Sequence, residues 1–227
     1  MVSIPVKLSA YSRDWDHELN RMENLNDEYR YHSADPTHSN GYLWEPLRRI
    51  VTEHKLADAR IFEVGCGNGA TSDMLSKLGY QVTAVDPSCS GIEHASSAYP
   101  HVSFHQGSAY DDLSSDYGTY PIVVSLEVVE HCFWPRKYAK CVYELLEPGG
   151  TAIISTPYHG YWKNLALALA GKFDHHWSPL WDGGHIKFWS EKTLSSLLAE
   201  VGFTSIEFVR VGRIPPLAMS MIAIARK

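Results

Sequence analysis

The sequence predicts an α/β fold in which helices cover both faces of a mostly parallel sheet. From about residue 60 onward, short apolar runs alternate with amphipathic stretches of helical length, which is typical of consecutive βαβ units. One junction is distinctive, because an apolar run ends in Gly65, Gly67 and Gly69 directly before a helix. Glycines in such a turn allow positive φ and a close approach of the backbone to a ligand. We therefore expect a ligand site where this strand ends.

The elements can be placed in order from their start and stop signals. Gly79 ends the first helix of the alternation, Pro135 suits a helix start, and the turn at 147–150 stops that helix before the next strand. The expected strands are 61–64, 81–85, 102–105, 121–126, 151–155, 204–210 and 217–225. The expected helices are 44–54, 69–78, 90–98, 136–146 and a last helix that Ser190 caps and Gly202 ends.

Two segments fall outside the alternation. Residues 1–57 are rich in charged and aromatic groups and include an irregular stretch at 31–41, so we expect a helical and irregular N-terminal cap before a domain at 58–227. Residues 157–189 form an insertion that is longer than an ordinary strand-to-helix connection. Long loops in compact domains are usually lids or binding loops. We expect both segments to form a lid over the ligand site.

Composition narrows the partners and the compartment. The chain has 227 residues, a length that fits one large domain. Its formal net charge of −6 argues against a protein whose main function is to bind nucleic acid. Its four cysteines lack C-x-x-C spacing, and the histidines of the insertion match no strong ligand motif, so we expect no metal. The sequence shows no leader and no apolar stretch of membrane-spanning length, which favours a cytoplasmic protein without membrane insertion.

The residues around the glycine loop bear on the ligand. The loop alone also fits the dinucleotide pattern G-x-G-x-x-A. Glu63 lies two residues before the first glycine, at a strand end where an unpaired buried carboxylate is unfavourable, so it should have a partner. The next strand ends in Asp86, about 20 residues on, where a carboxylate can accept hydrogen bonds from both hydroxyls of a ribose. The flanks therefore predict a ribose-containing cofactor.

The Glu-x-Gly-x-Gly-x-Gly run at 63–69 resembles the first motif of the class I S-adenosylmethionine (SAM) methyltransferases. Segments 127–131, 147–150 and 155–157 resemble the branch that includes ubiquinone-biosynthesis O-methyltransferases. The resemblance covers about residues 58–227. It implies a Rossmann-like sheet of seven mostly parallel strands with an antiparallel last strand. It also implies SAM as the cofactor and S-adenosylhomocysteine (SAH) as the product.

The same resemblance implies which residues hold the cofactor. The acidic residue and the loop backbone would hold its methionine end, and Asp86 its ribose. Where the family commonly has Gly-Asp-Ala after the third strand, this chain has Gly107-Ser108-Ala109, so a serine hydroxyl replaces the carboxylate that meets adenine. The predicted cofactor-binding residues are Glu63, Gly65, Cys66, Gly67, Gly69, Asp86, Pro87, Ser108, Ala109 and Leu126.

A hydroxyl acceptor needs its proton removed, since a free phenol has a pKa near ~10. His131 follows the fourth strand by a few residues and is the predicted base, although it could instead fix the loop through a hydrogen bond. Glu127 is the second predicted catalytic residue. Its carboxylate could orient the imidazole of His131, bind the substrate or brace the turn. Of the two glutamates in this segment, Glu130 is expected to be the more exposed to solvent. Aromatic side chains suit a flat apolar acceptor. The predicted acceptor-binding residues are Tyr158, Trp177, Trp181 and His185.

The leading hypothesis is a SAM-dependent methyltransferase acting on a small molecule, with a hydroxyl of an aromatic or quinone-like compound as the candidate acceptor. An NAD(P)-dependent oxidoreductase is the alternative enzyme class; it would need a pyrophosphate at the helix N-terminus and would leave Glu63 unexplained. A non-catalytic SAM-binding protein is the third alternative. The expected partner is a small-molecule acceptor, and the sequence makes no prediction of oligomeric state.

Overall fold

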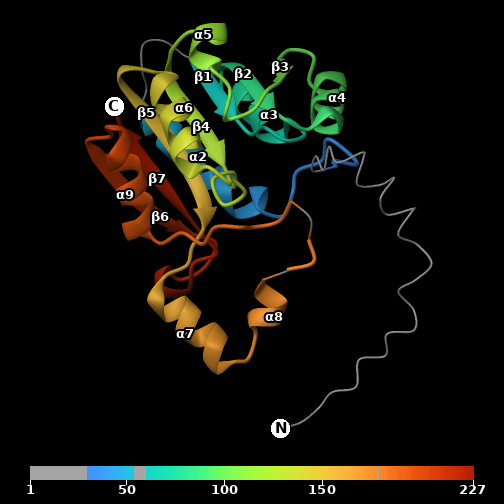
Figure 1. Ribbon diagram of the computed structural model, residues 1–227. Coiled ribbons are helices and arrows are strands. Elements are labelled where there is room, and N and C mark those ends of the chain that lie inside the picture. The colour runs from blue at the N-terminus through green and yellow to red at the C-terminus, as the bar shows by residue number, and fades with distance from the viewer. Residues whose placement is uncertain (1–29, 54–59, 178, 182) are drawn as a thin grey trace, which may run out of the picture.

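The computed structural model describes residues 30–53, 60–177, 179–181 and 183–227. Its centre is a seven-stranded sheet in the order β3-β2-β1-β4-β5-β7-β6 (Figure 1). The strands are β1 (Arg60–Val64), β2 (Gln81–Asp86), β3 (Ser103–Gln106), β4 (Tyr120–Leu126), β5 (Leu146–Pro157), β6 (Ser205–Val211) and β7 (Ser220–Arg226). β7 pairs antiparallel with β5 and β6, whereas the other neighbouring strands pair parallel. The predicted mostly parallel sheet with an antiparallel last strand is confirmed.

Helices cover both faces of this sheet. On one face lie α2 (Asn40–Glu53), α3 (Ala70–Lys77) and α4 (Cys89–Ala98), and on the other lie α5 (Leu113–Tyr117), α6 (Pro135–Glu144) and α9 (Glu191–Val201). Successive side chains of a strand point to opposite faces, so Ile61 packs in one core and Phe62 in the other. Burial on both faces explains why the central strands read as continuous apolar runs. No described helix is both long and apolar enough to cross a membrane.

Three elements, α2, β5 and β7, begin three or more residues away from their predicted positions. β5 begins at Leu146 rather than at residue 151, because Leu146 already pairs with Tyr120 before a register shift leads to the pairing of Thr151 with Ile122. α2 begins at Asn40, ahead of the expected residue 44, and the Asn40 side chain is held by the Thr37 N–H at 2.6 Å and by the Thr71 hydroxyl at 3.0 Å. β7 begins at Ser220 because Pro215–Leu217 forms a 3₁₀ turn, and proline has no N–H for a strand ladder. Of the predicted cap, residues 1–29 and 54–57 lie outside the described residues.

The insertion contains two short helices that the sequence analysis did not place, α7 (Tyr161–Leu169) and α8 (Phe173–His176). Both lie beyond the carboxyl end of β5, apart from the two helical layers (Figure 1). The end of the insertion is tied to the turn after β4, because the N–H groups of Ile186 and Lys187 both donate to the Glu130 carbonyl at 3.0 Å. This contact places the end of the insertion beside the carboxyl-terminal end of β4.

Candidate cofactor and acceptor site

A cavity of about 1250 Å³ opens at the carboxyl ends of β1, β2, β4 and β5. Ligands of open α/β sheets lie at such ends, where the strand order reverses, and β1 here lies between β2 and β4. Ligand pockets commonly measure about 300–1,000 Å³, so this cavity has room for a cofactor and a second molecule. The predicted site residues that line it are Glu63, Gly65, Cys66, Gly67, Asp86, Pro87, Leu126, Glu127, His131, Trp177, Trp181 and His185.

The glycine loop is held in shape by the end of β2. The N–H groups of Gly65 and Cys66 donate to the Val85 carbonyl at 2.8 and 3.0 Å. The Gly67 N–H donates to Asp86 Oδ2 at 2.8 Å, and Gly67 has a φ of 54°. Asp86 therefore braces the loop. A carboxylate oxygen can accept more than one hydrogen bond, so this role is compatible with the predicted ribose contact.

Glu63 has the partner that the sequence predicts. The residue is 2% exposed, and its Oε2 accepts a hydrogen bond from the Ser72 hydroxyl in α3 at 2.5 Å. Burial raises the pKa of Glu63 to about 7; the Ser72 hydrogen bond lowers it, and the charge of Asp86 adds to the rise. A cationic ligand group would favour the ionised carboxylate. The ammonium at the methionine end of SAM is such a group.

Sequence reasoning predicted that the N-terminal segment covers the ligand site, but it did not identify the contacts that place residues 31–35 over the glycine loop. Tyr31 lines the cavity, and a Cβ added at Gly67 would clash with its phenol group. The Asn68 side chain donates to the carbonyls of Ser33 and Asp35 at 2.9 and 2.8 Å, which fixes the segment against the loop. This stretch has no apolar periodicity. Its irregular composition was the one signal in the sequence, and it did not reveal these long-range contacts.

Four predicted ligand residues do not line the cavity: Gly69, Ser108, Ala109 and Tyr158. Gly69 is the N-cap of α3. The Ser108 hydroxyl accepts a hydrogen bond from the Tyr110 N–H at 3.2 Å within a local turn. The Tyr158 ring is buried under the Arg210 guanidinium, 4.7 Å from the ring centre. Ala109 packs against the core on the α6 side of the sheet. The assignment of these four residues to the ligands stays a prediction.

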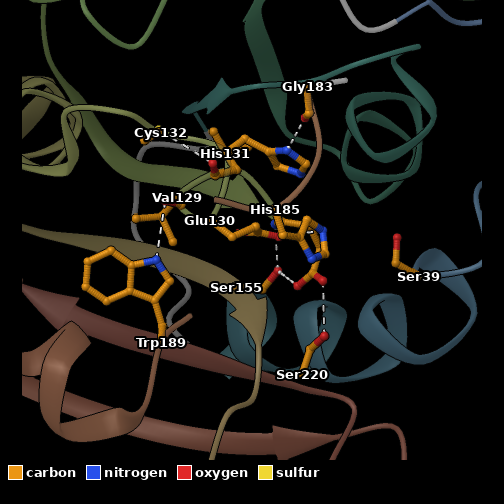
Figure 2. Close-up of polar contacts among 12 residues, drawn as sticks. Ser39, Val129, Glu130, His131, Cys132, Ser155, Gly183, His185, Trp189 and Ser220 are labelled. Atoms are coloured by element: carbon orange, nitrogen blue, oxygen red, sulfur yellow. Dashed lines mark hydrogen bonds and ion pairs between the residues drawn. The ribbon is translucent and has the colours of Figure 1, made fainter. Parts of the chain in front are cut away.

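Glu127 follows β4 in a backbone conformation that is rare for residues with a side chain. Its φ is 54°, and strain of this kind gathers at functional sites. Its carboxylate accepts hydrogen bonds from the hydroxyls of Ser155 at 2.8 Å and Ser220 at 3.1 Å. The two serines are labelled in Figure 2. Burial raises the pKa of Glu127 to about 7, against the lowering effects of both hydroxyls and of Lys163.

The expectation that Glu130 is the more solvated glutamate is wrong. It is 1% exposed, and neither side-chain oxygen has a hydrogen-bond partner within 3.5 Å among the described residues. The insertion covers it, because Ile186 and Lys187 bind the Glu130 carbonyl. Burial, followed by the charge of Glu127, raises the pKa of Glu130 well above its ordinary value. A buried carboxyl without a hydrogen-bond partner is unfavourable unless it is protonated or meets a cation. Nε2 of His185 lies 3.9 Å from Oε1 of Glu130.

His131 is held in one tautomer. Its Nδ1 lies 2.8 Å from the Gly183 carbonyl oxygen, which can only accept, so Nδ1 carries a proton and, in the neutral ring, Nε2 holds the lone pair (Figure 2). Burial lowers the pKa of His131, which keeps the imidazole neutral at pH 7. The rings of His185 and Trp181 stand edge-on to it, with centroids at 4.8 and 5.8 Å. The insertion thus helps to position the predicted base.

Glu130, His131 and His185 offer ligand atoms that all lie within 4.8 Å of one another. The prediction of no metal rested on the spacing of cysteines and histidines along the chain, whereas Glu130 and His131 join His185 from outside the insertion. Two imidazoles and a carboxylate are a ligand set that divalent transition metals accept. A hydrogen bond such as that of His131 Nδ1 to Gly183 is the contact that commonly orients a ligating histidine. The cluster could therefore hold a divalent cation.

The rest of the cavity is formed by what we call the insertion wall, the lining residues within 157–185 and 213–220. Trp177 stacks on Phe173 with ring centres 4.3 Å apart, and it lies 5.2 Å from the ring of Phe188. Trp181 and His185 line the same wall. An acceptor with a flat apolar ring would find aromatic surface here.

Comparison with known proteins agrees with this geometry. A family model described as a methyltransferase domain matches residues 16–207. This chain belongs to that methyltransferase family. The predicted class I methyltransferase fold is thereby confirmed, with SAM as its methyl donor.

Individual relatives are more distant. A ubiquinone biosynthesis O-methyltransferase of Caulobacter sp. (strain K31) is 34% identical over 125 residues, which are 53% of this chain and 49% of the relative. A protein of the same name from Ruegeria pomeroyi is 28% identical over 165 residues, 70% of this chain and 66% of the relative. The chain thus spans about half to two thirds of the length of these relatives.

A solved structure supports the fold. Magnesium protoporphyrin IX methyltransferase from Synechocystis PCC 6803, crystallised with bound SAH, superposes with a TM-score of 0.62 at 19% identity. The match covers 81% of this chain and 80% of that protein.

Proposed function

We propose that this methyltransferase transfers the methyl group of SAM to a hydroxyl group of a small aromatic or quinone-like acceptor. The observation that carries the proposal is the position of His131, which lines the same cavity as the glycine loop and donates from Nδ1 to the Gly183 carbonyl, so that Nε2 is the ring atom left to take a proton. The names of the curated relatives support oxygen as the methylated atom. The aromatic side chains of the insertion wall favour a flat acceptor.

The sulfonium of SAM is a good electrophile, so the protein has to align the acceptor in line with the methyl group and exclude water. The acceptor oxygen forms a bond to the methyl carbon while the carbon–sulfur bond breaks, which leaves neutral SAH. Nε2 of His131 takes the hydroxyl proton. Glu127, fixed by Ser155 and Ser220, orients the acceptor hydroxyl from the end of β4.

The cluster beside His131 favours a second way to activate the hydroxyl. A divalent cation held by Glu130, His131 and His185 would lower the pKa of a bound hydroxyl. In that case Glu130 would hold the cation from the interior, and the two imidazoles from the cavity. The two assignments differ in the effect of a chelator, since proton removal by a free imidazole needs no metal.

The test is a methyl-transfer assay with labelled SAM and a panel of catechols and hydroquinones, with the methylated atom located by NMR. O-methylation that is lost in His131→Ala and kept in His101→Ala, an exposed histidine outside the cavity, would support the proposal. Activity in the presence of EDTA would assign His131 as the base, and loss that divalent ions reverse would assign the cation. SAM binding without an O-methyl product from any acceptor would contradict the proposal and favour a non-catalytic SAM-binding protein.

The NAD(P)-dependent oxidoreductase alternative has little left to support it. It rested on a glycine pattern that the methyltransferase motif also satisfies, and the family model that matches residues 16–207 is a methyltransferase domain.

A further inference from the structure

The insertion wall carries cations that the proposed proton transfer does not use. Lys163 lies in α7, Lys172 precedes α8, and Arg213 lies in the connection from β6 to β7; all three line the cavity. The described residues of the insertion wall include no carboxylate. The acids that line the cavity, Glu63, Asp86 and Glu127, lie at or just beyond the ends of β1, β2 and β4. The negatively charged side chains of the cavity thus lie at the strand ends, and the positively charged ones lie on the insertion wall.

Lys163 is the most buried of these cations. It is 7% exposed, and its Nζ donates to the Met219 carbonyl at 3.1 Å. None of the three cations has a carboxylate of a described residue within 4.0 Å. Burial and then the charge of Arg213 lower the pKa of Lys163 to about 8, against an opposing effect of Glu127. A buried ammonium without a counterion is unfavourable, so an anion bound beside Lys163 and Arg213 would stabilise both.

Nε1 of Trp177, a buried polar atom of the same wall, lacks a hydrogen-bond partner among the described residues, and it lies beside His159, whose ring interacts with the Asn164 side chain. Trp177 and His159 both line the cavity, with ring centres 6.4 Å apart. Burial and then the charge of Lys163 lower the pKa of His159 to about 4, so its ring is neutral at pH 7. The Trp177 indole N–H can only donate. Native structures rarely leave such atoms unpaired, and a ligand oxygen would satisfy the indole.

We propose that the methyl acceptor carries an anionic oxygen group, a carboxylate or a phosphate, that binds to Lys163 and Arg213 while the acceptor hydroxyl faces His131. The inference rests on the proposed function, because it concerns the acceptor of the same reaction. A guanidinium binds such groups through paired N–H donors, and an ammonium binds them as a point charge. The acids at the strand ends repel an anion, so the division of charge also sets which end of the acceptor enters first.

The test compares acceptors that differ only in this group. 3,4-Dihydroxybenzoate and its neutral amide have nearly the same shape, and 3,4-dihydroxyphenyl phosphate replaces the carboxylate by a phosphate. Each is titrated calorimetrically into ligand-free protein and into protein saturated with SAH, and methyl transfer from labelled SAM is measured in parallel. Wild type should bind at least one of the two anions about tenfold more tightly than the amide, as expected for a charge-assisted contact. The preferred anion identifies the group.

Arg213→Gln is the deciding variant, because Arg213 is exposed and its replacement should not disturb the core. It should remove most of the preference for the anion and leave the affinity for the amide nearly unchanged. Lys163→Met should act in the same direction. Lys192→Gln, an exposed lysine of α9 outside the cavity, should keep the preference.

Two results in a protein that binds SAH would overturn this inference and leave the proposed function standing. One is equal affinity for the amide and the anions, and the other is no binding of any of the three compounds. An anion preference that Arg213→Gln fails to reduce would overturn it as well. Failure to bind SAH, or transfer to carbon or nitrogen alone, would instead contradict the proposed function.

Discussion

Asp86 joins the second strand to the glycine loop, so its loss should weaken cofactor binding in two ways. Its oxygens accept the N–H groups of Gly67 and Ser88 at 2.8 and 2.9 Å, and the predicted ribose contact adds to these. We expect Asp86→Ala to weaken SAH binding by about 1–3 kcal/mol, the range for charge-assisted hydrogen bonds. Calorimetry on the folded variant measures this. Asp116→Ala, an exposed acid in α5, is the matched control, and equal SAH affinity in both variants would refute the role of Asp86.

His131→Ala should lower the methyl-transfer rate by about 10²–10⁴-fold with little change in SAM affinity, as expected for loss of a general base. Because burial lowers the pKa of His131 from its ordinary 6.5, the acidic limb of the wild-type pH–rate profile should lie below pH 6.5. Stopped assays across pH 5–8 measure both. A lower melting temperature with a normal rate per folded molecule would show instead that His131 only anchors Gly183.

Individual site residues were predictable where the signal is local. Gly67 and Asp86 lie in a short strand–turn pattern, and the need of Glu63 for a partner follows from burial at a strand end. Glu130 was misjudged because its burial depends on the insertion, whose contact with the turn after β4 is a long-range one. Ser108 was assigned by its position in a motif that the chain does not fully keep.

The helix α7 of the insertion lines the cavity along one side. Lys163, Ala166, Leu167 and Ala170 line the cavity, and their spacing places them along one side of a helix. This spacing is present in the sequence, but the surrounding aromatic residues and the length of the segment led to its interpretation as an irregular lid. The regular βαβ elements were predicted more closely, because alternating apolar runs and glycine or proline stops repeat along that part of the chain.

Trp177→Ala should raise the acceptor KM more than it changes SAM affinity, because removal of an aromatic wall reduces contact with the acceptor. If the insertion closes over the site as a lid, amide hydrogens in α7 and α8 should exchange faster than those of the sheet, and more slowly once SAH is added. Steady-state kinetics and hydrogen exchange test these expectations together.

Trp134→Ala is the control for the kinetic measurement, since Trp134 is 52% exposed at the start of α6 and does not line the cavity. Trp177→Ala could instead show normal acceptor kinetics, with the same amide exchange rates in the presence and absence of SAH. That result would show that the insertion only packs against the domain and neither binds the acceptor nor closes over the site.

At the scale of the whole molecule, buried titratable groups at the site should make stability depend on pH. Glu63 has a pKa of about 7 in the folded protein against an ordinary value of 4.5. A raised pKa in the folded state stabilises the protein at low pH, and this stabilisation is lost as the pH rises from about 4.5 through about 7. The cavity histidines His131, His159 and His185, whose pKa values are lowered by partial or full burial, act in the opposite direction below pH 6.5.

A variant separates these effects. The melting temperature of wild type minus that of Glu63→Gln should fall as the pH rises from 5 to 8, since only wild type has this ionising group. The same difference for Glu53→Gln, an exposed acid at the end of α2, should stay flat. A difference for Glu63→Gln that grows with pH would mean that the carboxylate is stabilised in its charged form before any ligand binds.

The measurement that tests the central claim most directly is a parallel titration of SAH and NAD⁺ into wild type and Gly67→Val. We predict that wild type binds one SAH per chain and no NAD⁺. Gly67→Val should lose SAH, because a β-branched residue is strained at a φ of 54° and its Cβ would clash with Tyr31 above the loop. Binding of NAD⁺ in preference to SAH, or full SAH affinity in a folded Gly67→Val protein, would contradict the assignment of this cavity to SAM.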